Sequence, residues 1–267
     1  MTHWNTGICE ANGINIHYTR TGGNKSPVIL LHGLTANGAC WTSLANALEG
    51  DYDVIMPDAR GHGKSSAPHH GYRYEDFAND VVAFIKEMRL SSPALLGHSM
   101  GGMTAALVAS RKLALLHGLI LADPTFISAK YQREVYENDL ADQHSQMLNK
   151  SLDELIAEAR TRHSDRSEET LKLIARARLQ TSVCAFDVLT PPNPDYIQLV
   201  RSIDMPVLLV AGDGGVVSPA LAVELQRINS RIRFQQIQNA GHGIQYDQPD
   251  RFAAAVKSFL DLIPTQS

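Results

Sequence analysis

The 267-residue sequence lacks any apolar run that approaches the roughly 20 residues of a membrane-spanning helix. It also lacks an excess of basic residues, because 24 Lys and Arg stand against 28 Asp and Glu and give a formal net charge of −4. We therefore expect neither nucleic acid nor a membrane among its partners. The N-terminal residues show no basic stretch followed by an apolar one, so no secretory signal is expected.

Cysteine is also scarce, and the three residues Cys9, Cys40 and Cys184 lie far apart. An odd number of widely separated cysteines does not suit a disulfide framework, whereas free thiols are typical of the reducing cytoplasm. We therefore expect a cytoplasmic protein.

Two stretches that could suggest a cofactor do not complete their motifs. GHGKS at 61–65 resembles the tail of a phosphate-binding P-loop, but Asp58 stands where that motif needs a glycine. His62, His69 and His70 lie close in the sequence, but no carboxylate or cysteine at ligand spacing accompanies them. We expect no metal and no organic cofactor, and the sequence leaves the oligomeric state open.

Apolar runs that alternate with helical patterns account for most of the chain. Asn12-Gly13 suits a tight turn between two short opening strands. The apolar runs, which are typical of strands buried on both faces, are 27–33, 52–63, 92–99, 116–124, 205–213 and 231–237. The helical patterns between them are 40–48, 74–89, 99–110, 218–228 and 249–262. This alternation predicts an α/β fold with a mostly parallel sheet covered on both faces.

The alternation stops between residues 125 and 200. Charged residues crowd this segment, helical patterns such as LDELIAEARTR occur in it, and no buried strand is evident before the proline-rich stretch LTPPNPD. We predict a helical insertion, 125–200, that lies over one end of a core formed by 1–124 and 201–267. A solvated helical excursion without function is the alternative.

A serine stands between two glycines in Gly97-His98-Ser99-Met100-Gly101, which matches the pattern G-x-S-x-G. The match falls between a predicted strand and a predicted helix, and this context gives the motif its meaning. A sharp turn there exposes the hydroxyl at the edge of the sheet, beside the positive end of the following helix. The pattern predicts Ser99 as a nucleophile, and a glycine-rich turn with an incidental serine is the alternative.

A serine hydroxyl needs an adjacent base, and that base needs an acid to orient it. His242, in NAGHGIQYDQPDRF, follows the last strand-like run and precedes the last helix, so it would lie on a loop at the same edge as Ser99. Two carboxylates end strand-like runs, Asp123 in LILADP and Asp213 in VAGDGG. Both would lie at that edge, so the residues alone leave the acid open.

Four motifs, LLHGLTANG, MPDARGHGKS, GHSMGG and AGHGIQYDQPDRF, follow one another at fitting distances. In this order they resemble the α/β-hydrolase superfamily, in its small esterase, lactonase and haloperoxidase-like branch, almost from end to end of the chain. The resemblance implies an eight-stranded sheet with helices on both faces, an inserted helical cap, and a triad in the order Ser, acid, His.

The chain departs from the pattern of this superfamily at the acid. Relatives commonly place it three residues after the glycine that ends the seventh strand, and from Gly212 that position is Gly215. Asp213 stands one residue after the glycine, whereas other relatives supply the acid from the sixth strand, where Asp123 stands. We favour Asp123, whose backbone Pro124 is expected to hold extended, and keep Asp213 as the alternative.

The resemblance also implies the rest of the site. The backbone N–H groups of Leu34 and Met100 would form the oxyanion hole. The cap residues expected to line the substrate pocket are Phe126, Tyr131, Val183 and Phe186.

We expect a serine hydrolase of carboxylic esters or lactones that acts through an acyl-enzyme. ANGINIHYTRTGG and HGLTANGACW resemble microbial esterases with acyl-homoserine lactonase activity, which would make the protein a quorum-quenching enzyme. The alternatives are a triad-bearing small-molecule receptor with slow turnover, a cofactor-free haloperoxidase and a carbon–carbon bond hydrolase.

Overall fold

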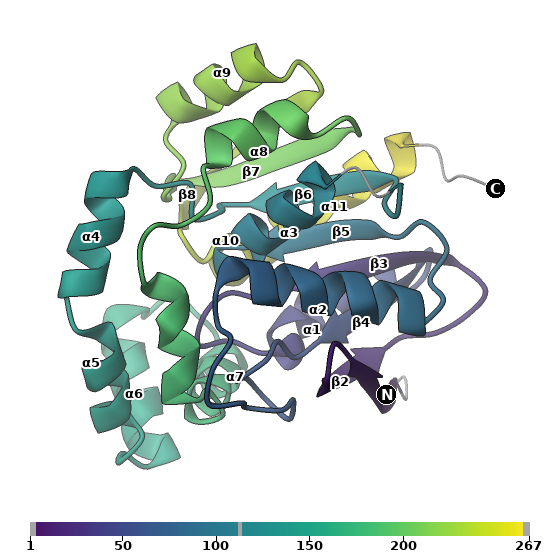
Figure 1. Ribbon diagram of the computed structural model, residues 1–267. Helices are drawn as coiled ribbons and strands as arrows, with labels where there is room; N and C mark the ends of the chain where they lie inside the picture. Colours follow the sequence, from purple (N-terminus) through teal and green to yellow (C-terminus); the bar gives the residue numbers. More distant parts are fainter. Residues whose placement is uncertain (1–3, 112–113, 264–267) are drawn as a thin grey trace.

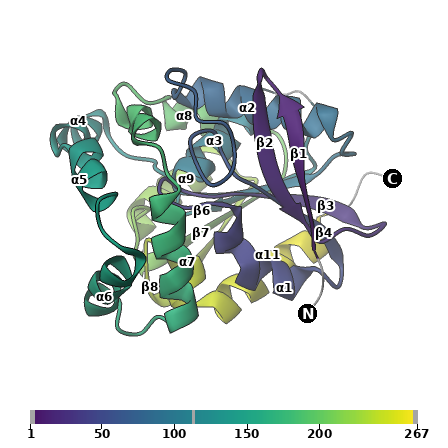
Figure 2. The ribbon, with the colours of Figure 1, turned by 90° about the horizontal axis from the view of Figure 1, so that it is seen from below.

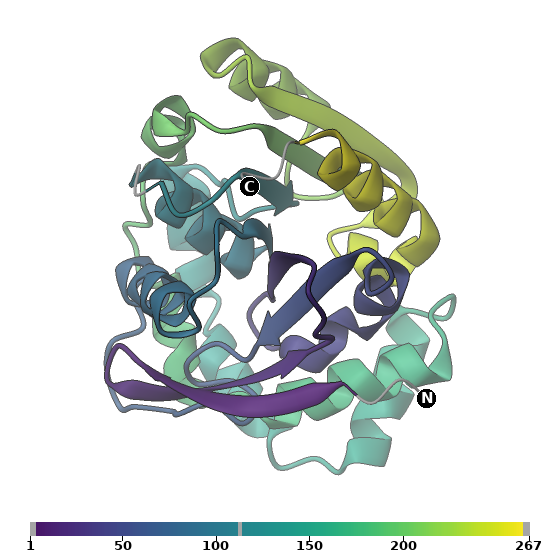
Figure 3. The ribbon, with the colours of Figure 1, turned by 90° about the vertical axis from the view of Figure 1, so that its right-hand side faces the viewer.

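The computed structural model describes residues 4–111 and 114–263 and contains an eight-stranded sheet (Figure 1). The strands are β1 (Asn5–Ala11), β2 (Ile14–Arg20), β3 (Ser26–Leu31), β4 (Tyr52–Pro57), β5 (Ala94–His98), β6 (Gly118–Ala122), β7 (Val207–Gly214) and β8 (Ile232–Gly241). Their order is β1-β2-β4-β3-β5-β6-β7-β8, and only the pairings of β2 with β1 and β4 are antiparallel in this part of the chain. Figure 3 shows the β1–β2 hairpin and the β7–β8 pair at opposite edges. The predicted fold is confirmed.

Helices connect the strands. The 3-10 helices are η1 (Gly38–Trp41) and η2 (Val183–Leu189). The α-helices are α1 (Thr42–Leu48), α2 (Tyr74–Glu87), α3 (Met100–Ser110), α4 (Ala129–Glu137), α5 (Leu140–Met147), α6 (Leu152–Arg162), α7 (Glu168–Leu179), α8 (Tyr196–Ser202), α9 (Pro219–Ile228), α10 (Ile244–Asp247) and α11 (Pro249–Leu262). Among the described residues, none of these helices has the length and apolar character needed to cross a membrane.

Two apolar layers cover the sheet, one on each face. Along β5, Leu95 packs into the layer under α2, α3, α8 and α9, whereas Ala94 and Leu96 pack into the layer under α1, α10 and α11. Figure 2 shows α2, α3 and α8 on one side of the sheet and α1 and α11 on the other. All residues of β5 are buried, which explains why its sequence is a continuous apolar run rather than an alternating one.

The helices α4 to α7 lie between β6 and β7 in the chain and gather on one side of the molecule (Figure 1). The amide of Asn37, after β3, donates to the side-chain oxygen of Gln180 at 2.9 Å. The N–H of Ser182 donates to the carbonyl of Gly61, after β4, at 2.7 Å. The inserted helices therefore contact loops at the carboxyl ends of parallel strands, the edge where active sites of such sheets form.

The predicted boundary of the insertion at residue 200 stays a prediction. That residue lies inside α8, whose Val200 is fully buried in the same apolar layer as α3. The helix begins after the proline-rich stretch 189–195, where Asp195 caps it by accepting from the N–H of Ile197 at 3.0 Å. The helix α8 thus packs against the layer that covers the sheet, as Ala185 and Val188 of η2 also do.

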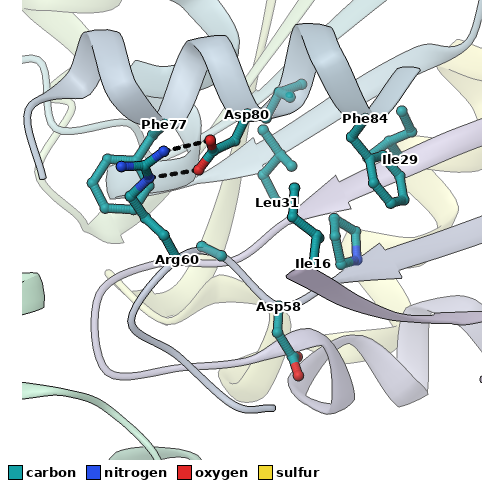
Figure 4. Close-up of a pocket in the computed structure, with 11 residues that line it drawn as sticks. Ile16, Ile29, Leu31, Asp58, Arg60, Phe77, Asp80 and Phe84 are labelled. Carbon is teal, nitrogen blue, oxygen red and sulfur yellow. Dashed lines mark hydrogen bonds and ion pairs between the residues drawn. The ribbon is translucent and has the colours of Figure 1, made fainter. Parts of the chain in front are cut away.

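Buried polar side chains hold the loop after β4. The carboxylate of Asp58 accepts from the N–H groups of Gly38 at 2.8 Å and Lys64 at 2.9 Å. Arg60 and Asp80 point toward each other in Figure 4, and two hydrogen bonds of 2.5 and 2.6 Å join them. The adjoining cavity holds about 30 Å³, which is too small for an organic substrate. This loop is structural.

Candidate active site

Ser99 occupies a strained turn between β5 and α3. Its φ of 54° and ψ of −118° lie outside the backbone regions that residues with a side chain ordinarily adopt. A Cβ at Gly97 would lie 2.1 Å from the carbonyl oxygen of Gly101, and a Cβ at Gly101 would lie 2.5 Å from that of Leu31. Both glycines of the motif are therefore required sterically, because the turn brings backbone against backbone.

Ser99, His242 and Asp123 follow β5, β8 and β6, so their side chains meet at one edge of the sheet. The Oγ of Ser99 lies 2.9 Å from Nε2 of His242. Nδ1 of the same ring lies 2.5 Å from Oδ2 of Asp123. The carboxylate accepts from Nδ1–H, which leaves Nε2 free to accept the serine proton. The three residues form a continuous relay of two hydrogen bonds.

Asp123 is completely buried, and backbone groups fix its carboxylate. The N–H groups of Val216 and Val217 each donate to it at 2.9 Å. The expectation of an extended backbone before Pro124 is wrong, because the φ of Asp123 is 41°. The chain must turn sharply out of β6 to direct the carboxylate to His242, and the two N–H bonds stabilise this unfavourable conformation.

Asp213, the alternative acid, does not bond to His242. Its carboxylate is held on the neighbouring strand by the N–H groups of Ala240 at 3.0 Å and Asn239 at 3.1 Å. These two donors also lower the pKa of its carboxyl. The side chain therefore stabilises the irregular end of the β7–β8 ladder, and the choice of Asp123 over Asp213 as the acid stays a prediction.

Gly215 lies beside the carboxylate of Asp123, the residue that follows β6. A Cβ at this position would lie 2.8 Å from both carboxylate oxygens of Asp123. The usual acid position of the resembled superfamily therefore has to lack a side chain here, because the Asp123 carboxylate occupies the adjacent space. Sequence reasoning noticed the missing carboxylate at 215 but not the need for glycine.

We expect Gly215→Ala to lower the turnover number by about 10- to 100-fold, because the new methyl group displaces the carboxylate from His242. Steady-state kinetics on a chromogenic ester would measure this. Gly214→Ala is the matched control, since a Cβ there would have its nearest neighbour at 3.6 Å, an ordinary contact. Equal rates for the two variants would show that the space beside Asp123 is unimportant.

The two N–H groups expected to form an oxyanion hole lie near Ser99. Met100 is the first residue of α3, directly after the serine. Leu34 follows Gly33, where a Cβ would lie 3.1 Å from the Cβ of Ser99. Across the described ranges, neither N–H donates to a backbone or side-chain acceptor. Both donors are thus available to a substrate oxygen.

Buried histidines brace this site from the core. His32 donates from Nδ1 to the carbonyl of Gly33 at 2.8 Å and accepts from the N–H of Ala59 at 2.9 Å, so it ties the loops after β3 and β4. His98 donates from Nε2 to the backbone carbonyl of His242 at 2.8 Å. Burial lowers the pKa of both supporting imidazoles, for His98 to about 3. The sequence does not predict this hydrogen bond to the carbonyl of His242, although His98 ends β5 and directly precedes Ser99.

We expect the free energy of unfolding to fall as the pH drops below about 6.5, the value for an unfolded histidine. Burial lowers the pKa of His62 and His98 to about 3, so the folded protein binds fewer protons than the unfolded chain between these values. Each contributes a loss of about 1.4 kcal/mol in total between pH 7.5 and 5.5, because the unfolded histidine takes up its proton within this interval. Urea unfolding at pH 7.5 and 5.5 would measure the loss.

The control for this pH effect is His62→Gln, which removes one of the two groups. Between pH 7.5 and 5.5 the variant should lose about 1.4 kcal/mol less stability than the parent protein. A stability that is unchanged between pH 7.5 and 5.5 in the parent protein would contradict the prediction.

The four expected pocket residues have different surroundings. Phe126 is buried and stacks on Tyr196 of α8, with ring centroids 5.0 Å apart. Phe186 is buried against a histidine of α5, Val183 begins η2, and Tyr131 on α4 is 50% exposed. Their contact with a substrate stays a prediction. In the described ranges, no group of three or more His, Cys, Asp or Glu is placed to hold a metal ion.

Comparison with known proteins gives matches along most of the chain. The chain is 33% identical over 261 residues to N-formylmaleamate deformylase of Pseudomonas putida, with 96% of each chain covered. It is 29% identical to an sn-1-specific diacylglycerol lipase of Mus musculus, over 87% of this chain and 80% of the relative. The crystal structure of E-2-(acetamidomethylene)succinate hydrolase superposes with a TM-score of 0.85 at 21% identity, covering 97% of this chain and 100% of that one.

The family described as alpha/beta hydrolase fold matches residues 26–249. This range begins with β3 and ends at the first residue of α11, so it includes Ser99, Asp123 and His242. The chain therefore belongs to the alpha/beta-hydrolase fold family.

Proposed function

We propose that this protein is a serine hydrolase of carboxylic esters or lactones that acts through an acyl-enzyme. The observation that carries the proposal is the relay from buried Asp123 through His242 to Ser99, with distances of 2.5 and 2.9 Å. Such a relay activates a hydroxyl that is otherwise a weak nucleophile. The strained turn at Ser99 presents that hydroxyl where a carbonyl can approach.

The first half of the reaction forms the acyl-enzyme. Nε2 of His242 takes the proton as Oγ of Ser99 attacks the carbonyl carbon of the substrate. The N–H groups of Leu34 and Met100 stabilise the negative charge that develops on the carbonyl oxygen, a contribution of about 3–4 kcal/mol per donor in comparable sites. His242 then protonates the leaving alkoxide, and in a lactone this step opens the ring.

The second half releases the acid. A water molecule takes the place of the leaving alcohol, and His242 removes a proton from it as its oxygen attacks the acyl carbon. The tetrahedral intermediate collapses, the bond from the acyl carbon to Ser99 breaks, and the proton returns to Oγ. Asp123 keeps the imidazole in the required tautomer and stabilises the imidazolium in both halves.

Cleavage of an N-acyl bond is the second candidate function. It is favoured by the 33% identity, over nearly the full length of both chains, to a protein named as a deformylase. The same relay serves this reaction, because His242 can protonate a leaving nitrogen as well as a leaving oxygen. A formamide or another N-acyl compound would then acylate Ser99 in place of an ester.

A substrate panel tests these alternatives. It contains p-nitrophenyl esters, simple lactones, acyl-homoserine lactones and N-formyl amides such as N-formylmaleamate, each assayed with the parent protein and with Ser99→Ala. Preferred turnover of acyl-homoserine lactones would support a quorum-quenching role. A stoichiometric burst with little turnover would support the receptor alternative, and equal activity of Ser99→Ala would overturn the proposed function.

A further inference from the structure

We infer that Arg166, in the helical insertion, is a positioning residue that fixes the loop carrying His242. Arg166 lies between α6 and α7, far in the sequence from any residue of the relay. It nevertheless lies against the segment after β8. There it pairs with Asp247, stacks on the ring of Tyr246 and lies beside Gly243. This inference rests on the proposed function, because it concerns the base of that reaction.

The ion pair of Arg166 with Asp247 is the first contact. Nε and Nη2 of the guanidinium both lie close to Oδ1 of Asp247, at 2.9 and 2.8 Å. The two side chains are only 11% and 20% exposed. By comparison, the pair of Arg160 and Glu168 in the same insertion has both side chains 58% exposed, and such surface pairs contribute little. The pair of Arg166 is therefore shielded from water as part of a packed contact.

Stacking and close packing complete the contact. The guanidinium carbon of Arg166 lies 5.2 Å from the centroid of the Tyr246 ring, a distance suited to a cation–π interaction. A Cβ at Gly243 would lie 2.8 Å from Nη2 of Arg166. The guanidinium thus lies directly beside the residue that follows His242.

Asp247 also bonds to the residue that precedes His242. Its second oxygen, Oδ2, accepts from the N–H of Gly241 at 2.9 Å. The residues before and after the imidazole are therefore both fixed by one carboxylate and one guanidinium. From the core side, His98 holds the carbonyl of His242 itself. These two contacts, one from the insertion and one from the sheet, hold the backbone of the loop, whereas Asp123 and Ser99 bond to the ring itself.

The function of this arrangement is to couple the insertion to the base. Ser99 and Asp123 are held in place by buried backbone around them. His242 differs, because its side chain is 41% exposed and lies on a loop. The other charged side chains around the ion pair, on the cavity between the insertion and this loop, are Arg162, His163 and Asp165. None of these three donates to or accepts from Asp247 in the described residues, so the hydrogen-bonded ion pair from the insertion to Asp247 comes from Arg166.

The test compares Arg166→Ala, Arg166→Lys and Asp247→Asn with the parent protein, and uses Arg160→Ala as the matched surface control. We expect Arg166→Ala to lower the turnover number by about 10-fold, with KM for a small ester changed less than about twofold, because the base is displaced while the acyl site is not. Lysine should restore part of the rate, since it keeps the charge without the planar fork. Asp247→Asn keeps an acceptor for Gly241 and should resemble Arg166→Ala.

Two further readouts separate positioning from general stability. The proton between Nδ1 of His242 and Asp123 should resonate far downfield in the parent protein and in Arg160→Ala, and broaden or shift in Arg166→Ala. The rate at which a fluorophosphonate labels Ser99 should fall in parallel with turnover, and this readout needs no knowledge of the natural substrate. A loss of thermal stability with an unchanged proton signal and unchanged labelling would overturn the inference.

The outcomes also distinguish this inference from the proposed function. If the parent protein is not labelled at Ser99 and Ser99→Ala is as active as the parent protein, the proposed function fails. If Ser99 is labelled in the parent protein and Arg166→Ala is labelled and turns over as fast as Arg160→Ala, the inference alone fails.

Discussion

Ser99→Ala should lower the rate of ester hydrolysis by about 10⁶-fold, to the background of the oxyanion donors and substrate binding. The Oγ of Ser99 is the atom that forms the acyl bond, and neither Met100 nor His242 offers a substitute at the same place. The alanine keeps the Cβ, so the strained backbone at φ 54° meets no new contact. Progress curves on a p-nitrophenyl ester with high enzyme concentration would measure the residual rate.

The control for Ser99→Ala is a comparison of its fold and stability with those of the parent protein. Circular dichroism and the urea midpoint should match those of the parent protein, because among the described residues the lost hydroxyl has one hydrogen-bond partner, Nε2 of His242. A folded Ser99→Ala protein that retains even one hundredth of the parent rate would exclude the acyl-enzyme mechanism. Such a result would point to water attacking the substrate directly.

Local patterns were sufficient to predict the nucleophile position and the place of His242. The motif around Ser99 predicts its own geometry, because Gly97 and Gly101 stand where the turn leaves no room for a Cβ. His242 was predicted from its place between the last strand and the last helix. The sheet was predictable for a similar reason, since each strand buried on both faces is a continuous apolar run.

Features that depend on long-range contacts were not predictable from local patterns. The backbone of Asp123 was expected to be extended, but bonds from Val216 and Val217, more than 90 residues later, stabilise a positive φ. Gly215 could be noticed as a missing acid, yet its reason is a contact with Asp123. The ion pair of Arg166 with Asp247 joins residues 81 positions apart, and no spacing rule links an insertion loop to a short helix.

Asp123→Asn should lower turnover by about 10⁴-fold, far more than Asp213→Asn. Oδ2 of Asp123 accepts from both His242 and the N–H of Val216, and Oδ1 accepts from the N–H of Val217. An asparagine must therefore place its NH₂ group against one of these backbone donors. When the NH₂ group stands at the Oδ2 position, the imidazole can meet it only by carrying its proton on Nε2, where it can no longer accept from serine.

Asp213→Asn is the matched control for this substitution, because it removes the same charge at the end of the neighbouring strand. Its carboxylate accepts from the backbone N–H groups of Asn239 and Ala240 rather than from His242, and an amide oxygen can replace one of these two bonds. We expect turnover within about twofold of the parent and a small loss of stability, because one of the two bonds is lost at an exposed position. Steady-state kinetics and urea unfolding of both variants would decide the assignment. If Asp213→Asn were the slower enzyme with its fold intact, the relay through Asp123 would not be the catalytic one, since a buried carboxylate 2.5 Å from His242 cannot be silent in this mechanism.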